Sequence, residues 1–261
     1  MRLFRDLYAY RELLKTNIKK DIRGKYKGSF LGVLWSFVNP LLMTLVYAIV
    51  FPFLMRGASY EHYTTYLVIG ILAWNWFTIS VSQGTWTIIG NGGIIKKVYF
   101  PREILPISVV TSGLINYLIS CLIIGIFLLF SGIGFSWYLV FLPLIVIAQY
   151  LFTLGVVFIT SSINVYVRDL EYIVNFIVQM LFYGTPILYS LDLFQNAPAY
   201  VKLVIHLNPM TTIIDCYRDI FYWQSIPHIK SLFIVMGASF LLCLIGLAIF
   251  RKLSKGFAEE V

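Results

Sequence analysis

The chain has 261 residues, of which 59% are hydrophobic and 12% charged, and its mean hydropathy is +0.83. This composition excludes an ordinary soluble globular domain and indicates that most of the chain lies in a lipid bilayer. The formal net charge of +8 raises the question of a nucleic-acid partner, but the basic residues are distributed as membrane orientation requires, and no nucleic acid is expected.

Residues 1–31 predict a basic amphipathic helix followed by a basic turn. Apolar side chains recur every three or four residues with Lys and Arg between them, a pattern typical of a helix lying in the headgroup plane. The alternative is that this segment only anchors the topology. In the turn, Arg23, Lys25 and Lys27 are expected at headgroup level, where they meet phosphates of ordinary lipid or of a substrate.

Six runs of about 20 apolar residues predict six transmembrane helices, because about 20 helical residues cross a hydrocarbon core. The expected spans are 32–55, 63–89, 104–131, 137–165, 170–190 and 229–250. The predicted organisation is therefore an interface helix and basic turn (1–31), a six-span membrane domain (32–250) and a short tail (251–261). The fold class is an all-α integral membrane protein.

The basic residues orient these spans. Of the 20 Lys and Arg residues, nine lie in 1–31, three in 90–103, one in 166–169 and three in 251–261. The other four are Arg56, Lys202, Arg218 and Lys230, in the loops of the opposite side. The positive-inside rule then places both termini in the cytoplasm.

The outer segment 191–228 is too apolar for a free loop and too interrupted for a crossing helix. Asn208-Pro209 is typical of a helix start, with Asn as the cap and Pro in the first turn. We expect short helices near 198–206 and 209–222 that form a re-entrant hairpin between the fifth and sixth spans. Asp215 and Arg218 are expected to pair on one face of the second helix.

Residues 90–103, G-N-G-G-I-I-K-K-V-Y-F-P-R-E, interrupt the apolar sequence between the second and third spans. Ile94, Ile95, Val98 and Tyr99 are expected on one side of a short helix, with Lys96 and Lys97 pointing elsewhere. No phosphate-loop motif occurs in the chain, so it is not expected to bind ATP itself. The stretch predicts either a docking surface for a soluble partner or ordinary loop packing.

The fifth predicted span carries a polar stripe in which Glu171, Asn175 and Gln179 repeat every four residues. Such a stripe suits a channel wall or hydrogen bonds between helices. Aromatic residues beside it, and on the first and second spans, are candidates for the same channel or for packing and interface anchoring: Tyr172, Phe176, Tyr183, Trp35, Tyr47, Trp74 and Trp76. The three cysteines and three histidines have no metal-ligand spacing, and no metal is expected.

Four ordered motifs carry a resemblance to a known family. They are K-Y-K-G-S-F-L-G-V-L-W-S-F-V-N-P-L-L after the basic helix, V-Y-F-P-R-E after the second span, V-Y-V-R-D-L after the fourth and L-N-P-M before the sixth. Together they resemble the permease subunits of ABC-2 type polysaccharide exporters, which export O antigens and wall teichoic acids. The resemblance covers essentially the whole chain.

The resemblance implies how such a permease works. Two copies of the permease form a channel in the bacterial plasma membrane and pair with two copies of a separate ATPase, which holds ATP and Mg. The chain itself then needs no cofactor and is not an enzyme. The cargo is a glycan linked to undecaprenyl diphosphate, whose pyrophosphate meets Arg23, Lys25 and Lys27, and the outer hairpin closes the exit. The residues expected to contact the ATPase are Ile94, Ile95, Lys96, Lys97, Val98, Tyr99, Arg102 and Glu103.

Three other functions compete with this interpretation. A drug- or lipid-exporting permease of the same superfamily is the nearest. An integral-membrane enzyme acting on polyprenyl phosphate would need paired carboxylates, and neither D-x-D nor D-D-x-x-D occurs. A secondary transporter or passive channel would predict internal repeats with matching broken helices, and the two halves show no convincing repeat.

Overall fold

The computed structural model describes residues 5, 8–24, 35–54, 61–189, 198, 205 and 207–261. Within these residues every regular element is helical and no strand occurs, which confirms the expected all-α class. The elements are α2 (Arg11–Gly24), α3 (Trp35–Leu54), α4 (Tyr63–Gly90), α5 (Gly92–Ile95), α6 (Ile104–Phe130), η2 (Trp137–Phe141), α7 (Leu142–Asn164), α8 (Leu170–Gly184), α10 (Pro209–Phe221), α11 (Ile229–Leu253), η4 (Ser254–Gly256) and α12 (Phe257–Glu260).

Four helical segments of the described chain are long and apolar enough to cross a membrane. They are Tyr63–Gly90, Ile104–Phe130, Trp137–Asn164 and Ile229–Glu260, and they coincide with the second, third, fourth and sixth predicted spans. The predicted fifth span is α8, whose 15 residues fall short of the usual crossing length. The predicted first span contains α3, an uncharged helix of 20 residues. The count of six spans therefore remains a prediction.

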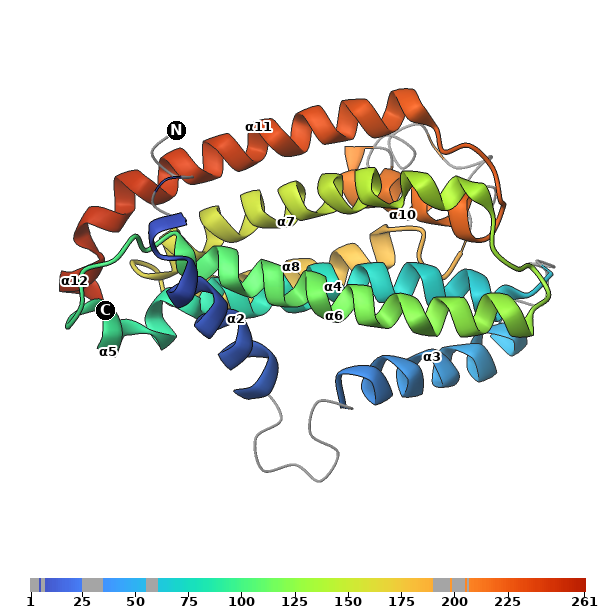
Figure 1. Cartoon of the computed structure of the whole chain (residues 1–261), viewed down its shortest axis with the longest axis horizontal. Coiled ribbons are helices and arrows are strands. Elements are labelled where there is room, and N and C mark those ends of the chain that lie inside the picture. Colours follow the sequence, from blue (N-terminus) through green and yellow to red (C-terminus); the bar gives the residue numbers. More distant parts are fainter. Residues whose placement is uncertain are drawn as a thin grey trace.

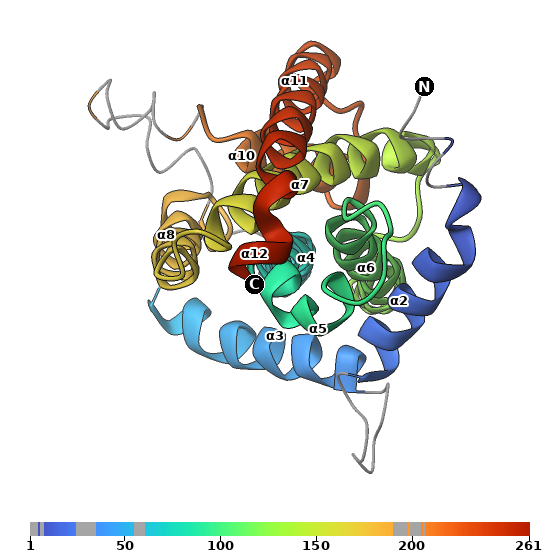
Figure 2. The same cartoon turned by 90° about the vertical axis from the view of Figure 1, so that its left-hand side faces the viewer.

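The central helix of the bundle is α4. The helices α3, α6, α7 and α8 surround it, as the view along the bundle shows (Figure 2). No charged residue occurs in α4, and bulky apolar side chains occur around its whole circumference, so all its faces can be buried. The most apolar window of α4 is 78% buried within the chain, compared with 17% for α11.

The outermost long helix, α11, packs along α7 (Figure 1). Their backbones approach closely at two glycines, because a Cβ added to Gly246 would lie 2.6 Å from the carbonyl oxygen of Gly155. Small residues allow such an approach between membrane helices, where van der Waals contact rather than water exclusion holds the pair together. Seven large apolar side chains of α11 remain exposed and are available to lipid.

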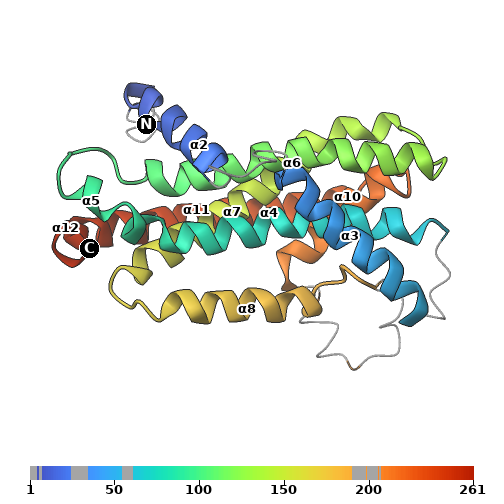
Figure 3. The same cartoon turned by 90° about the horizontal axis from the view of Figure 1, so that it is seen from below.

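One end of the bundle, here called the α5 end, gathers α2, α5, α12 and the C-terminus (Figure 1). Helix α2 and the C-terminus thus lie at the same end of the bundle, and the side of the membrane that they face stays a prediction. Helix α2 packs obliquely against α6, and α8 lies on the opposite side of the bundle (Figure 3). Helix α3 also crosses the bundle obliquely.

The segment between the fifth and sixth predicted spans is described only in part. Helix α10 confirms the predicted second helix, and the Asn208 side chain accepts a hydrogen bond of 3.0 Å from the Met210 backbone nitrogen, as expected of a cap. Most of the predicted helix at 198–206 lies outside the described residues. The re-entrant hairpin is therefore not confirmed. Helix α10 itself is largely buried against α4, α7 and α11.

Candidate functional site: the α5 end and the exposed face of α8

The loop between α4 and α6 presents a small mixed surface at the α5 end. Ile94 is 46% exposed, Val98 58% and Tyr99 92%, and the side chains of Lys96 and Lys97 are also exposed. We call these five residues the docking face. Apolar groups this exposed, with lysines beside them, suit contact with a second protein more than a solvated loop.

Ile95 does not belong to the docking face. The expectation that it shares one side with Ile94, Val98 and Tyr99 is wrong, because its side chain is only 5% exposed and packs into the core. The helix α5 spans only four residues, so its single turn must point one side chain inward to hold the loop on the bundle.

Arg102 and Glu103 also point into the chain rather than out of it. The Arg102 guanidinium donates to the carbonyl oxygen of Ser254, and the Glu103 carboxylate pairs with Arg251 Nε at 2.9 Å. Both residues therefore join the start of α6 to the end of α11. A direct contact with a partner stays a prediction for both residues, and Arg102 keeps N–H donors that the bond to Ser254 does not use.

Asn91 connects the loop to two helices, and no sequence pattern singled it out. Its side-chain nitrogen donates to the Thr87 carbonyl at 2.7 Å, and its side-chain oxygen accepts from Lys20 Nζ at 2.9 Å. The second bond reaches from α2 to the entrance of α5. An Asn between glycines at a helix end is a capping signal, but its partner lies 71 positions away and no local pattern reveals it.

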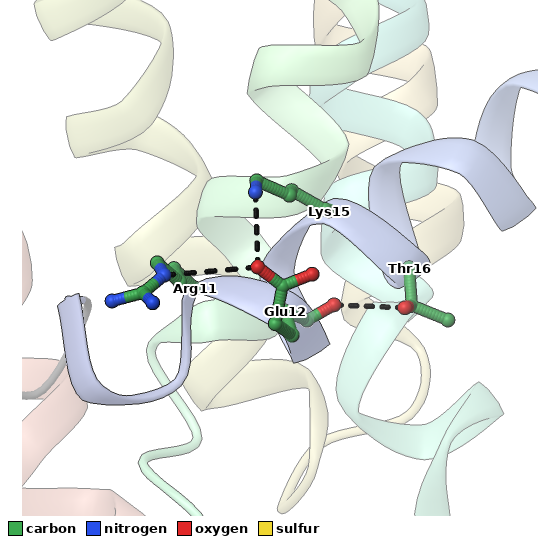
Figure 4. Close-up of polar contacts among 4 residues, drawn as sticks. All are labelled: Arg11, Glu12, Lys15 and Thr16. Atoms are coloured by element: carbon green, nitrogen blue, oxygen red, sulfur yellow. Dashed lines mark hydrogen bonds and ion pairs between the residues drawn. The ribbon is translucent and has the colours of Figure 1, made fainter.

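The polar side of α2 carries a local charge network (Figure 4). Lys15 Nζ donates to the Glu12 carboxylate at 3.0 Å, Arg11 Nε lies 3.7 Å from the same oxygen, and Thr16 Oγ1 donates to the Glu12 carbonyl at 2.8 Å. The hydrogen bond from Lys15 lowers the pKa of Glu12, since it favours the ionised carboxylate. These exposed contacts organise the helix surface and add little stability.

Helix α2 also has an anchored side. Its Asp21 accepts a hydrogen bond of 3.5 Å from Ser108 Oγ of α6, and burial raises the pKa of that carboxyl. Among the predicted headgroup residues, Arg23 lies in the last turn of α2. Lys25 and Lys27 lie outside the described residues, so the proposed phosphate contacts remain predictions.

The predicted polar stripe on α8 does not face one environment, because the side chains of Asn175 and Gln179 have different surroundings. The Asn175 side-chain oxygen accepts from Ser82 Oγ of α4 at 2.5 Å, and the Glu171 backbone nitrogen donates to the Asn164 side chain at 3.1 Å. Asn175 thus makes the inter-helix contact that was the alternative to a channel wall. Gln179, by contrast, is exposed.

The exposed side of α8 carries three aromatic residues beside the aliphatic Ile173, Ile177, Met180 and Leu181. Tyr172 is 75% exposed, Phe176 62% and Tyr183 70%. Their spacing of four and seven residues places them on one helical face together with Gln179. We call these four residues the α8 face. Within a single chain it has no covering element among the described residues, and it is suited either to lipid or to a second molecule.

The tryptophans predicted as channel residues are mostly packing residues. Trp74 and Trp76 are 4% and 3% exposed. The Trp74 ring contacts Phe77 and Phe182, and the Trp76 ring stacks on Tyr117 with centroids 5.1 Å apart. Both rings pack inside the chain, as the packing alternative expects, although Trp76 also lines a cavity with Asn75 and Ser120, and their channel role stays a prediction. Of the two remaining aromatic candidates, Trp35 is 36% exposed, and the side chain of Tyr47 is outside the described part.

Comparison with known proteins identifies the family. The family model named ABC-2 type transporter matches residues 12–222, most of the chain. The chain belongs to the ABC-2 type transporter family. Two similar proteins are both called O-antigen export system permease protein RfbA. One, from Myxococcus xanthus, is 35% identical over 261 residues and covers 100% of both chains. One from Klebsiella pneumoniae is 36% identical over 250 residues, 95% of this chain and 94% of the relative.

A more distant relative of this ABC-2 transporter is the capsule polysaccharide export inner-membrane protein CtrC of Neisseria meningitidis, 21% identical over 262 aligned positions that cover 97% of this chain and 96% of the relative. The family match and the four apolar helices together show a multi-pass membrane protein. Among the residues that the structure describes, no group of His, Cys, Asp and Glu could hold a metal ion.

The matched region of the ABC-2 transporter starts within α2 and ends just after α10. It therefore contains the docking face and the α8 face. Helix α11 follows it, and the full-length relatives extend over that helix as well. The interface helix, the loop at the α5 end and the central bundle are thus parts of one length of chain that matches the family rather than additions to it.

Proposed function

We propose that this protein is the membrane-spanning subunit of an ATP-driven exporter of a polysaccharide. The observation that carries the proposal is the 35% identity to an O-antigen export permease, in an alignment that covers 100% of both chains. The similarity to a capsule export protein points to the same class of cargo. The polymer is linked to undecaprenyl diphosphate and moves from the cytoplasm to the outer face of the bacterial plasma membrane.

In this proposal ATP and Mg bind to a separate ATPase that docks at the α5 end, which is cytoplasmic. The docking face supports this assignment because it presents Ile94, Val98 and Tyr99 next to two lysines. The inward bonds of Arg102 and Glu103 give the loop a rigid connection to α11. Movement of the docked ATPase can therefore reach two spans at once.

The channel is proposed to form between two copies of the chain. The α8 face supports this arrangement, because three exposed rings and an exposed amide, that of Gln179, lie on one side of the helix. Sugar rings stack on aromatic side chains through their C–H faces and bind amides through their hydroxyl groups. A homodimer brings two such faces together around one path. Arg23, Lys25 and Lys27 would receive the pyrophosphate at its cytoplasmic end.

The experiment that tests the function purifies the tagged protein from its native membrane in mild detergent and identifies the co-purifying proteins and lipids by mass spectrometry. We expect an ABC ATPase in equal amount and a polyprenyl-diphosphate-linked glycan. Val98→Asp should lose the ATPase, since a carboxylate would enter an apolar contact. Lys230→Asp, at the far end of α11, is the matched control and should keep it. Recovery of an attached drug-like or simple lipid cargo, or activity in a bilayer without ATPase, would contradict the proposal.

A further inference from the structure

A second basic feature at the α5 end lies beside the docking face. The start of α6 and the end of α11 enclose a cleft of about 550 Å³ whose lining includes Arg102, Glu103, Arg251 and Lys255. We call it the basic cleft. Three cations against one carboxylate leave it with net positive charge. The acidic residues of α12, Glu259 and Glu260, are exposed and do not line it.

The charges in the basic cleft are only partly used within the chain. Arg251 and Glu103 pair at 2.9 Å, and Arg102 donates to a backbone carbonyl of Ser254, which carries no full charge. Lys255 is exposed and, among the residues that the structure describes, makes no ion pair. Arg102 and Lys255 are therefore available to an anion that enters the cleft.

The position of the basic cleft decides which anion it meets. The apolar sequence of α6 begins at Ile104, directly after Arg102 and Glu103, and that of α11 ends at Phe250, directly before Arg251. The cleft is thus at the level where two membrane helices leave the hydrocarbon, which is the level of lipid phosphates. Tyr99 of the docking face also lines the cleft, so the two surfaces are continuous, and the test of the cleft has to follow a co-purifying ATPase as well as the lipid.

The neighbourhood of α11 supports a lipid occupant further. This helix lies on the outside of the bundle (Figure 1), and Phe240, Leu241, Leu244 and Ile245 leave its apolar side exposed. Acyl chains that cover this side bring their headgroup to Arg251 and Lys255. Basic pockets at the cytoplasmic ends of membrane helices are suited to anionic headgroups.

We propose that the basic cleft binds the phosphate of an anionic phospholipid of the cytoplasmic leaflet, held between Arg102 of the loop and Lys255 after α11. The bound headgroup connects the loop between α4 and α6 to the end of α11 and to the surrounding membrane. The proposal concerns ordinary membrane lipid and does not depend on which polymer the protein exports.

The test measures lipid binding to the purified full-length protein by native mass spectrometry during titration with dioleoyl phosphatidylglycerol or dioleoyl phosphatidylcholine. Wild type should retain one phosphatidylglycerol per chain and much less phosphatidylcholine. Lys255→Glu changes the charge by two units and should weaken phosphatidylglycerol binding about 25-fold, at about five-fold per unit of charge. Lys230→Glu makes the same charge change on an exposed residue at the other end of α11, more than a Debye length from the cleft, and should change binding less than about two-fold.

Two further measurements serve as controls. One tests for a folding defect, and the other tests whether free phosphate binds in the cleft. Arg251→Lys keeps the charge and should keep the lipid, which separates electrostatic loss from a folding defect. Inorganic phosphate at millimolar concentration should not displace the lipid, because it lacks acyl chains. The proposal is overturned if both charge reversals weaken binding equally, if phosphatidylcholine binds as well, or if phosphate alone displaces the lipid. It is also overturned if Lys255→Glu removes a co-purifying ATPase and leaves lipid retention unchanged.

Discussion

The guanidinium carbon of Arg218 lies 3.6 Å from the centre of the Tyr66 ring. Both residues are almost fully buried. Arg218 also donates to the carbonyl oxygens of Pro186 and Ile187, at 2.5 and 2.7 Å, and lies 3.7 Å from an Asp215 carboxylate oxygen. The expected local pair with Asp215 is confirmed, but it is the smaller part of the contact. One arginine joins α10, α4 and the turn after α8.

Removing this arginine should destabilise the half of the bundle opposite the α5 end. Arg218→Met keeps an apolar stem but takes the donors away from two carbonyl groups and the charge away from Asp215. We expect a loss of about 2–4 kcal/mol in unfolding free energy, measured by thermal unfolding in detergent. The unfolding free energy of Arg218→Lys should lie between those of wild type and Arg218→Met, because an ammonium keeps the charge but lacks the planar fork of donors. The exposed control Lys230→Met should be neutral, and an unchanged melting temperature for Arg218→Met would contradict the assignment.

The contact between α7 and α11 predicts unequal effects of two glycine substitutions on one helix. An alanine at Gly246 would place its Cβ 2.6 Å from the Gly155 carbonyl oxygen, so the helices must separate, at a cost of about 1–3 kcal/mol. Gly237 has no atom within 4 Å of an added Cβ. Gly237→Ala should be neutral or stabilising by up to about 1 kcal/mol. Equal melting temperatures for the two variants would show that the close approach is absent.

Asn164 is a buried positioning residue at the α5 end. Its side-chain nitrogen donates to the Thr85 carbonyl at 3.2 Å, and its oxygen accepts from the Glu171 backbone nitrogen at 3.1 Å. Asn164→Ala should cost about 1–3 kcal/mol because both backbone groups lose a partner. Thermal unfolding measures this, and Gln179→Ala on the exposed side of α8 is the control. If both variants melt alike, Asn164 does not hold the start of α8.

Opposite outcomes are expected for two neighbours in the loop after α4. Ile95→Asp places a carboxylate in the core and should lower the melting temperature. Val98→Asp changes an exposed residue and should alter stability by less than about 0.5 kcal/mol, yet it should remove the proposed ATPase. Melting temperature and co-purification, measured on both variants, separate folding from docking. A stable Ile95→Asp protein would show that this side chain is not an anchor.

The interface helix should respond to pH through two carboxyl groups of opposite behaviour. Burial raises the pKa of Asp21, so its ionised form opposes docking of α2, and stability falls as pH rises through and above the ordinary carboxyl range near 4. Asp21→Asn should therefore protect α2 amides from hydrogen exchange at pH 7, with a difference that shrinks toward pH 3.

Glu12 is the matched comparison on the same helix. Its pKa is lowered by the Lys15 hydrogen bond, so the contact stabilises above the ordinary carboxyl range and is lost as pH falls. Glu12→Gln should weaken protection at pH 7 and have little effect at low pH. If both substitutions raise, or both lower, the protection of α2 amides at pH 7, the assigned surroundings of Asp21 and Glu12 are wrong.

The local sequence was sufficient to predict an element where the start of that element depends only on its own residues. Asn208-Pro209 predicted the start of α10, because a cap and a first-turn proline act within one turn. The same Asn also donates to Thr185 Oγ1 at 2.8 Å. That second contact joins α10 to the end of α8, and no sequence pattern predicts it.

Assignments to a surface were less successful, since they depend on neighbours. Trp74 and Trp76 are aromatic residues of an apolar helix, and nothing in their sequence context separates a channel wall from a core. Their burial follows from the central place of α4, which other helices surround. Ile95 was misplaced for a related reason: a helix of one turn has no repeating pattern from which its inner side can be read.

The sequence by itself determined that this protein is an all-helical membrane protein, the approximate extent of four of its long helices, and the family to which it belongs. Those properties follow from hydrophobic length, from caps and turns, and from ordered motifs, all of which are local in the chain. Only the tertiary structure decided which side chains are free. Arg218 reaches two carbonyls 31 and 32 positions away, Lys20 reaches Asn91, and Glu103 reaches Arg251 across 148 positions. Such contacts depend on which helices become neighbours, and that is set by packing of the whole bundle.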